Sequence, residues 1–409
     1  MMQASHPTDG SPSAGRLLEL LCLLWLAGMA MRITILAVPP VLPLIRDDLG
    51  MTETEVGLLI GLPLVAWAVA AVPGSLLIAR WGATLTLTAG LTVTALAAAS
   101  RGAAPNVWLL YLATAVMGFG IAIVQPAVPT LVRDWLPHRI GLGIAVATNG
   151  MLVGIAAGPT LTFLLVLPLV GQSWRLDLVV WAAPVLFAAL MFLALVPRAP
   201  SPQDPGRTDA SGDNGRQWWP DWHNPLIWLL GLTFGSNNAV YYGTNAFLPD
   251  YLASIGRADL IGSALGWMNG SQLIASTLLL VTAEHVQRRT WPYLVFGPAP
   301  LVGVIGILWA DGIGIVVAAA LTGFSLAVTF VVTLALPPVL SPPGDVHRIS
   351  AGMFTVSFAF AVIVPVICGA LWDLTGRPWA AFAPVGACSV ALTMLGVALS
   401  RHRPAAKTS

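Results

Sequence analysis

Residues 198–222 read RAPSPQDPGRTDASGDNGRQWWPDW, a polar run rich in proline and glycine. This composition is typical of a solvated linker, because it offers few apolar side chains to a packed core. Long hydrophobic runs lie on both sides of it. The segment therefore divides the chain into two hydrophobic halves. Trp218, Trp219 and Trp222 close the linker, where we expect aromatic rings at the level of lipid headgroups.

The hydrophobic runs are each about 20 residues or longer, enough to cross roughly 30 Å of hydrocarbon as a helix. The predicted spans are 17–44, 52–79, 84–101, 106–132, 140–168, 173–197, 223–254, 260–283, 290–310, 311–340, 347–374 and 377–400. Six precede the linker and six follow it. Only Asp311, Gly312 and Gly314 separate the ninth and tenth spans, so an eleven-helix alternative stays open, although about 50 apolar residues are too many for one span.

The composition agrees with a membrane protein. Hydrophobic residues make up 57% of the chain and charged residues only 9%, against roughly 25% charged in soluble proteins. We therefore predict an all-α integral membrane protein with twelve transmembrane helices in two six-helix bundles. The expected organisation is a disordered tail over 1–15, a first bundle over 16–197, the linker over 198–222, a second bundle over 223–400 and a C-terminal tail over 401–409.

The charges indicate an orientation. Nineteen basic and 18 acidic residues give a net charge of +1, which argues against nucleic acid as a partner. If the N-terminus is cytoplasmic, thirteen basic residues fall on inner segments and five on outer loops, namely Arg46, Arg101, Arg175, Arg257 and Arg377. This asymmetry follows the positive-inside rule. It predicts a multi-pass protein of a bacterial-type inner or plasma membrane with both termini in the cytoplasm.

Arg32 is the one basic residue left over, and it lies halfway along the first span. An arginine at mid-membrane costs about 3 kcal/mol, so it should face a cavity or a partner. An unpaired guanidinium in a hydrated cavity binds small anions or carboxylates. The structural alternative is that Arg32 bonds helix-end carbonyls or side-chain amides and holds the bundle together.

The acidic residues fall at span ends or in loops. We therefore expect no acid to pair with Arg32. Proton-coupled carriers usually hold a titratable group inside the membrane, so coupling through a dedicated buried carboxylate is disfavoured. Uniport, anion exchange and a proton carried with the substrate stay open.

Other polar and aromatic residues within the spans are candidates for the same cavity. In the seventh span, Asn237, Tyr241 and Asn245 share one helical face and Asn238 lies beside it. Each lone amide is explained equally well by a helix–helix hydrogen bond. The remaining candidates are Gln125, Asn149, Gln272, Trp67 and Phe358.

Other classes of protein are less favoured. The six histidines are scattered over the tail, loops and span ends, and the three cysteines show no metal-binding spacing. We expect neither a metal nor a cofactor. A membrane enzyme should show a cluster of His, Asp or Glu side chains at one face, so the scattered histidines argue against an enzyme. A sensor that has lost transport should carry a soluble signalling domain, for which the tails and the linker are too short.

Six helices on either side of a cytoplasmic linker resemble the major facilitator superfamily. The resemblance implies two pseudo-symmetric bundles that rock about a central site. The superfamily's glycine- and charge-bearing loop after the second helix is matched by Gly74, Arg80 and Gly82, without its aspartate. The counterpart after the eighth helix has Glu284, Arg288 and Arg289. The resemblance implies a gating role for both loops on the cytoplasmic side.

Within the superfamily the chain is similar to the cyanate permease and nitroimidazole transporter branch over nearly its whole length. The matching stretches are Met31-Arg32 followed by Pro39 to Pro43, GFGIAIVQPAVP over 118–129, FGSNNAVYYGTNAFLP over 234–249 and GFS over 323–325. The resemblance implies a monomer in the lipid bilayer that moves a small, anionic or polar solute by alternating access. Efflux of nitroaromatic or drug-like compounds is the alternative.

Overall fold

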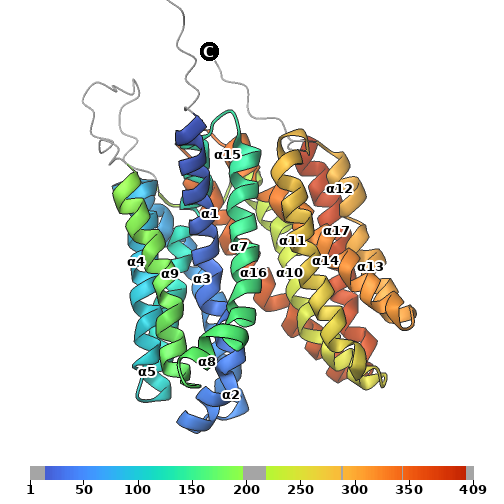
Figure 1. Ribbon diagram of the computed structural model, residues 1–409. Helices are drawn as coiled ribbons and strands as arrows, with labels where there is room; N and C mark the ends of the chain where they lie inside the picture. Colours follow the sequence, from blue (N-terminus) through green and yellow to red (C-terminus); the bar gives the residue numbers. More distant parts are fainter. Residues whose placement is uncertain (1–13, 197–217, 287–288, 343, 402–409) are drawn as a thin grey trace, which may run out of the picture.

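The computed structural model describes residues 14–196, 218–286, 289–342 and 344–401, without the side chains at 53, 54, 57, 163, 283, 284 and 286. Most of both predicted tails and of the predicted linker lies outside the described residues, as do Arg288 and the side chain of Glu284. Within the described ranges the chain is helical and contains no strand (Figure 1).

The first half contains six membrane-crossing segments, several of them broken into shorter helices. They are α1 (Ala14–Leu36) with α2 (Val38–Leu49), α3 (Glu53–Trp81), α4 (Ala83–Gly102), α5 (Val107–Val124) with α6 (Ala127–Trp135), α7 (Ile140–Leu161) with the π-helix η1 (Thr162–Val166) and α8 (Leu167–Leu169), and α9 (Trp174–Leu195).

The second half repeats this arrangement. It contains α10 (Pro225–Ser254), η2 (Ala258–Leu260) with α11 (Ile261–Val286), α12 (Trp291–Phe296) with α13 (Ala299–Trp309), α14 (Ile313–Leu334) with α15 (Pro337–Leu340), α16 (Val346–Thr375), and η3 (Pro378–Ala381) with α17 (Phe382–Arg401). Because α13 ends before Asp311 and α14 begins after it, the eleven-helix alternative for 290–340 is wrong.

Eleven stretches of the described residues are long and apolar enough to cross a membrane. The twelfth long helix is α10, which spans 30 residues but carries the polar stripe that includes Asn237, Asn238 and Asn245. Polar side chains lower the mean hydropathy of a helix without shortening it. The predicted twelve-helix organisation is therefore confirmed, and its least apolar member is the helix expected to line the site.

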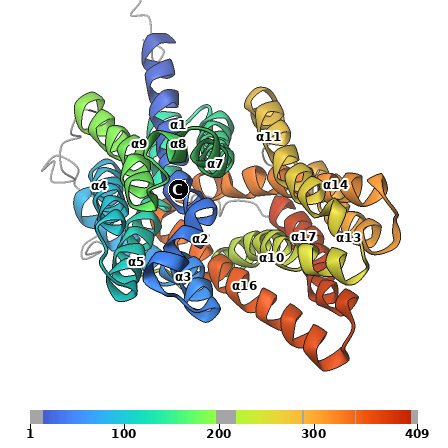
Figure 2. The same ribbon diagram turned by 60° about the horizontal axis from the view of Figure 1, so that its bottom comes forward.

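The helices form two groups that lie side by side (Figures 1 and 2). In the first half α1 packs on α7, and α4 packs on both α5 and α9. In the second half α10 packs on α16 and α17, and α14 packs on α11 and α13. The halves meet where α3 contacts α16 and where α7 contacts α11.

Prolines explain where the long segments break. Pro39 and Pro40 follow the junction of α1 and α2, Pro126 separates α5 from α6, and Pro337 begins α15. A proline lacks the backbone N–H of a helical residue and its ring crowds the preceding turn. The fourth segment of the first half and the fourth of the second half both break near the same end, as the predicted pseudo-symmetry requires.

Glycines bring α1 and α7 into close contact. A Cβ added at Gly150 would overlap the backbone carbonyl of Trp25, and one at Gly154 would lie 2.7 Å from the carbonyl oxygen of Met29. Gly28 on α1 meets the backbone of Ala147 in the same way. Small residues permit such close packing of membrane helices, and this packing holds Arg32 beside α7.

The start of α1 and the end of α17 lie at the same end of the molecule, here named the terminal end (Figure 1). The halves are connected there. Arg133 of α6 donates a hydrogen bond to the backbone carbonyl of Ser341, and the Ser75 hydroxyl donates to the carbonyl of Trp218 at 2.7 Å. The terminal end is therefore closed by contacts between segments far apart in the sequence.

Candidate functional site

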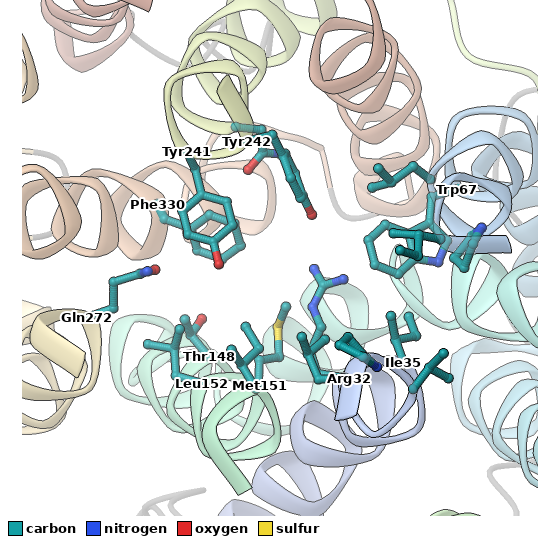
Figure 3. Close-up of a pocket in the computed structure, with 18 of the residues that line it drawn as sticks. Arg32, Ile35, Trp67, Thr148, Met151, Leu152, Tyr241, Tyr242, Gln272 and Phe330 are labelled. Carbon is teal, nitrogen blue, oxygen red and sulfur yellow. The ribbon is translucent and has the colours of Figure 1, made fainter. Parts of the chain in front are cut away.

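A cavity of about 280 Å³ lies between the two halves. Helices α1, α3, α5 and α7 of the first half and α10, α11 and α14 of the second half contribute to its wall. It extends from Arg32 and Gln272 toward the exposed residues Pro39 and Ile60, near the end opposite the terminal end. Figure 3 shows Arg32, Tyr241, Tyr242 and Gln272 directed into the same space.

Arg32 is one of two arginines that line the cavity, together with Arg101. Its guanidinium carbon lies 4.3 Å from the centroid of the Trp67 ring, a cation–π contact, and the residue is 7% exposed. Within the described part of the chain Arg32 forms no hydrogen bond and no ion pair. The structural alternative, in which Arg32 bonds carbonyls or amides, therefore does not describe this conformation.

Trp67 lines this cavity beside Arg32, whereas Phe358, which contacts Trp67, lines only a smaller cavity; the pair Trp67 and Phe358 is named the floor. The centroids of the Trp67 and Phe358 rings lie 5.1 Å apart, and Phe358 stacks on Phe354 at 5.9 Å. A second, much smaller cavity of about 20 Å³ lies on the terminal side of these rings and also touches Arg32. Gln125 lines this smaller cavity, not the larger one, and its buried Nε2 has no hydrogen-bond partner.

The polar stripe of α10 borders the larger cavity on the side of the second half. Asn237 accepts a hydrogen bond from the Thr329 hydroxyl at 2.6 Å, and Asn238 donates to the Ser357 hydroxyl at 2.7 Å. These bonds connect α10 to α14 and α16. Both amides line the cavity, so their orientation toward it is set by neighbouring helices.

Tyr241 and Gln272 continue this wall through a shared partner. The Tyr241 hydroxyl donates to Asn269 Oδ1 at 2.9 Å, and Gln272 Nε2 donates to the same oxygen at 3.3 Å. Asn245 does not line the cavity. It donates to the Tyr241 backbone carbonyl and accepts from Asn269 Nδ2 at 3.2 Å. Asn245 and Asn269 therefore hold α10 to α11 behind the two cavity residues.

Asn149 lies outside both cavities. Its side-chain oxygen accepts a hydrogen bond from the indole N–H of Trp25 at 3.1 Å, which connects α7 to α1. The spacing of residues in the sequence could not distinguish this helix–helix bond from a substrate contact. The structure shows that Asn149 forms a helix–helix hydrogen bond and does not line either cavity.

The structure also adds residues that the sequence analysis missed. Tyr242, Thr114 and Thr148 were not among the predicted site residues, yet all three line the cavity. Most of the remaining wall is aliphatic: Ile35, Leu36, Leu59, Leu64, Met151, Leu152, Ile155 and Leu326. Such residues look alike in sequence whether they face lipid, protein or a cavity.

Arg101 and Asp177 require a correction. The sequence analysis placed Arg101 in an outer loop, placed the acids at span ends or in loops and disfavoured coupling through a buried carboxylate, but the side chains of Arg101 and Asp177 are both buried, at 1% and 0% exposure. Arg101 lies in the last turn of α4 and lines the cavity, and Asp177 lies in the first turn of α9. The expectation failed because depth along a helix does not reveal the cover that neighbouring helices provide.

The described part of the two loop motifs lies at the terminal end. Gly74 packs against the backbone of Ile123, and Gly82 joins α3 to α4 with a φ of 81°, a value that favours glycine. Arg80 and Arg289 are exposed. Arg80 has no ion pair within the described ranges, and the predicted gating role of both loops stays a prediction.

Comparison with known proteins decides the family. The sequence profile of the Major Facilitator Superfamily matches residues 20–365. The chain belongs to the major facilitator superfamily. Its twelve helices in two bundles and its central cavity are those of a superfamily transporter, so the protein is a multi-pass membrane transporter and not an enzyme.

Two relatives from Escherichia coli (strain K12) match the chain along most of its length. The cyanate transport protein CynX is 27% identical over 378 residues, which cover 92% of this chain and 96% of the relative. The 2-nitroimidazole transporter is 25% identical over 382 residues, which cover 91% of this chain and 93% of the relative. The resemblance to the cyanate permease and nitroimidazole transporter branch of the superfamily is thus confirmed.

Solved structures of superfamily transporters have the same fold. FucP in the outward conformation superposes with a TM-score of 0.76 at 14% identity. The match covers 93% of this chain and 99% of the FucP chain. The proton:xylose symporter XylE gives a TM-score of 0.77 at 12% identity, with 94% and 95% covered. At these identities the likeness shows the fold alone.

Proposed function

We propose that this transporter moves a small anionic solute by alternating access, with the central cavity as its binding site and Arg32 as its anchor. The observation that carries the proposal is the Arg32 guanidinium, which faces the cavity without an ion pair in the described structure. A charge held away from water is stabilised by a counter-ion. A planar anion can accept two parallel hydrogen bonds from a guanidinium.

The residues in the cavity wall favour solutes of a particular shape and polarity. The second half offers polar groups to the cavity from Asn237, Asn238, Tyr241, Tyr242 and Gln272, and the first half offers them from Arg101, Thr114 and Thr148 besides Arg32. Aliphatic side chains cover most of the remaining surface. A solute with one negative charge and a flat or partly apolar body would pair with Arg32 and still contact these walls. Cyanate, which the name of one relative gives as its cargo, carries a single negative charge.

The closed terminal end supports an outward-facing state. The arginine distribution predicts that this end is cytoplasmic. The contacts of Arg133 with Ser341 and of Ser75 with Trp218 close it, whereas the cavity extends toward exposed residues at the other end. In the proposed cycle these contacts separate and the floor of Trp67 and Phe358 opens, so that the solute leaves on the cytoplasmic side.

A thermal-shift screen of the purified protein tests the binding step. The probes are cyanate, nitrite, nitrate, formate, bicarbonate and benzoate as sodium salts, with sodium chloride as the salt control. A ligand at 100 times its Kd stabilises the native state by about 2.7 kcal/mol. We expect at least one probe to raise the unfolding midpoint of the wild type and of Arg139→Ala, an exposed control, but not of a folded Arg32→Ala protein. Equal shifts in all three proteins would refute the proposed anchor.

The apolar and aromatic walls support a second candidate, the efflux of nitroaromatic compounds. Trp67, Tyr241, Tyr242 and Phe330 place four aromatic rings around the cavity, and a relative bears the name 2-nitroimidazole transporter. Overexpression should then confer resistance to 2-nitroimidazole, whereas an anion importer should load vesicles with its solute. The two measurements separate the candidates.

A further inference from the structure

The larger cavity offers more space than a triatomic anion fills. Its volume is about 280 Å³, close to the lower end of the roughly 300–1,000 Å³ that small-molecule sites occupy in proteins. One water molecule, with a single heavy atom, takes up about 30 Å³ in the liquid. A triatomic anion at Arg32 would therefore leave most of the cavity to water or to other parts of a larger solute.

A second polar place in the cavity wall lies away from Arg32. Figure 3 shows Thr148 and Gln272 on one side of Arg32 and Trp67 on the other, with Met151 between Thr148 and Arg32. A solute held by its charge at Arg32 would thus contact an apolar side chain before it reaches Thr148. The cavity has a charged end, an apolar middle and a neutral polar end.

The Thr148 hydroxyl at the polar end lacks a partner of its own. Several threonine hydroxyls in the described helices donate to the carbonyl four residues earlier, as Thr88 does to Thr84 at 2.9 Å. Thr148 lies within α7 and is 2% exposed, yet its hydroxyl forms no hydrogen bond in the described structure. A buried polar group without a partner is unfavourable. A ligand that supplies the missing partner removes this penalty when it binds.

Gln272 offers a complementary group from the other half of the molecule. It lies on α11, which packs on α7, and it lines the same cavity as Thr148. Its Nε2 donates to Asn269 Oδ1 at 3.3 Å, which holds the side-chain amide in place. The Oε1 of the same amide is a hydrogen-bond acceptor, and a hydroxyl both donates and accepts. One hydroxyl of a solute can therefore accept from Thr148 and donate to Gln272.

We propose that the cavity binds an organic monoanion with a hydroxyl at the end opposite its charge, and that Thr148 and Gln272 form the subsite for this hydroxyl. A carboxylate pairs with Arg32, a short hydrocarbon body lies against Met151, and the hydroxyl bridges α7 and α11. The carboxylate end rests on the proposed function. The subsite adds the substrate class, a short hydroxycarboxylate in place of a triatomic inorganic ion, which reaches Arg32 alone.

Calorimetric titration with matched acids tests the subsite. The probes are the sodium salts of propionate, butyrate and valerate, and of the same three acids with a terminal hydroxyl. One added hydrogen bond raises affinity about 2- to 10-fold. We expect at least one hydroxy acid to bind the wild type more tightly than its parent acid by this factor. The preference should persist in Thr88→Val, which removes a buried threonine hydroxyl outside both cavities.

Variants of the two subsite residues identify the hydroxyl's partners. Thr148→Val should lose the preference for the hydroxy acid and bind the parent acid as the wild type does, whereas Thr148→Ser should keep the preference. Because the Thr148 hydroxyl has no partner, the valine variant should unfold no earlier than the wild type. Gln272→Met should also lose the preference.

The outcomes separate the subsite from the anchor. A preference that persists in either folded variant, Thr148→Val or Gln272→Met, would overturn the subsite. So would a wild type that binds the parent acids, loses them in Arg32→Ala and shows no preference for a hydroxy acid, and that result would leave the anchor in place. Absence of binding by all six acids would refute the anchor and the subsite together.

Discussion

Trp67 of α3 and Phe358 of α16 form a ring contact of 5.1 Å that joins the two halves beside Arg32. Arg32 rests on the same indole, 4.3 Å from its centroid. The residue proposed to bind the anion and the aromatic contact that closes the floor of the cavity therefore share one side chain. Binding at Arg32 and opening of the floor can be coupled through Trp67.

Trp67→Leu should weaken anion binding, because it removes the aromatic face that positions Arg32. A cation–π contact contributes about 0.5–2 kcal/mol, so we expect the Kd for a stabilising probe to rise several-fold, up to roughly 30-fold. Trp67→Phe keeps an aromatic face and should lose less. Isothermal titration calorimetry measures both, and equal losses in the two variants would contradict the stacking role.

Arg32→Lys should retain part of the binding that Arg32→Ala loses. Lysine keeps the charge but not the planar fork of donors. We expect a larger loss for formate and benzoate, whose two oxygens match a guanidinium, than for linear cyanate. Calorimetric titration of the three anions gives the ratio of the losses. The same loss for every anion would argue against bidentate recognition.

Asn238→Ala and Asn149→Ala should have different effects. Asn238 lines the cavity, so its replacement should weaken probe binding. Asn149 bonds Trp25 away from the cavity, so Asn149→Ala should leave the Kd unchanged and lower stability by about 0.6 kcal/mol. Titration and thermal unfolding of the two proteins test this, and a changed Kd in Asn149→Ala would place that amide at the site.

Gly150→Ala should destabilise the first half. The added methyl would overlap the backbone of Trp25, and overpacking of this kind costs about 1–3 kcal/mol. Gly270→Ala is the matched control, because no atom lies within 4 Å of a Cβ there. The unfolding midpoint in detergent should fall for Gly150→Ala and stay level or rise for Gly270→Ala. The reverse order would show that α1 and α7 do not pack as described.

Ile60→Cys should react with a membrane-impermeant maleimide added outside intact cells, because Ile60 lines the exposed end of the cavity. Trp219→Cys, exposed at the terminal end, should react only after permeabilisation. Both substitutions are made in a background without the three native cysteines. Labelling of Trp219→Cys in intact cells would reverse the orientation that the arginines predict.

The sequence predicted the fold well, because a bilayer allows few solutions. Every span needs about 20 apolar residues, and charges mark the ends of the spans, so the helices begin and end within a few residues of the predicted spans. The division between two helices at Asp311, which the sequence marks only weakly, was also predicted correctly. The least apolar span, α10, was predicted from its length, and the stripe of asparagines and tyrosines on it supplied candidate cavity residues.

The site was only partly predictable. Arg32, Asn238 and Tyr241 stood out because polar side chains inside a span require a partner or a cavity. Asn149 and Asn245 met the same criterion but bond to neighbouring helices. Gln125 faces a separate, smaller cavity. A single helix shows which side chains are polar and which share a face, but not which neighbour they meet.

The sequence by itself determined the number of spans, the six-and-six division and the isolation of Arg32, because membrane thickness relates position in the chain to depth. Only the tertiary structure decided that Trp67 contacts Arg32 and that Arg101 and Asp177 are both buried. The packing of α1, α3, α4 and α9 produces these environments. The physical reason is that burial near a membrane surface depends on neighbouring helices, and contacts between distant segments leave no periodic signal in the chain.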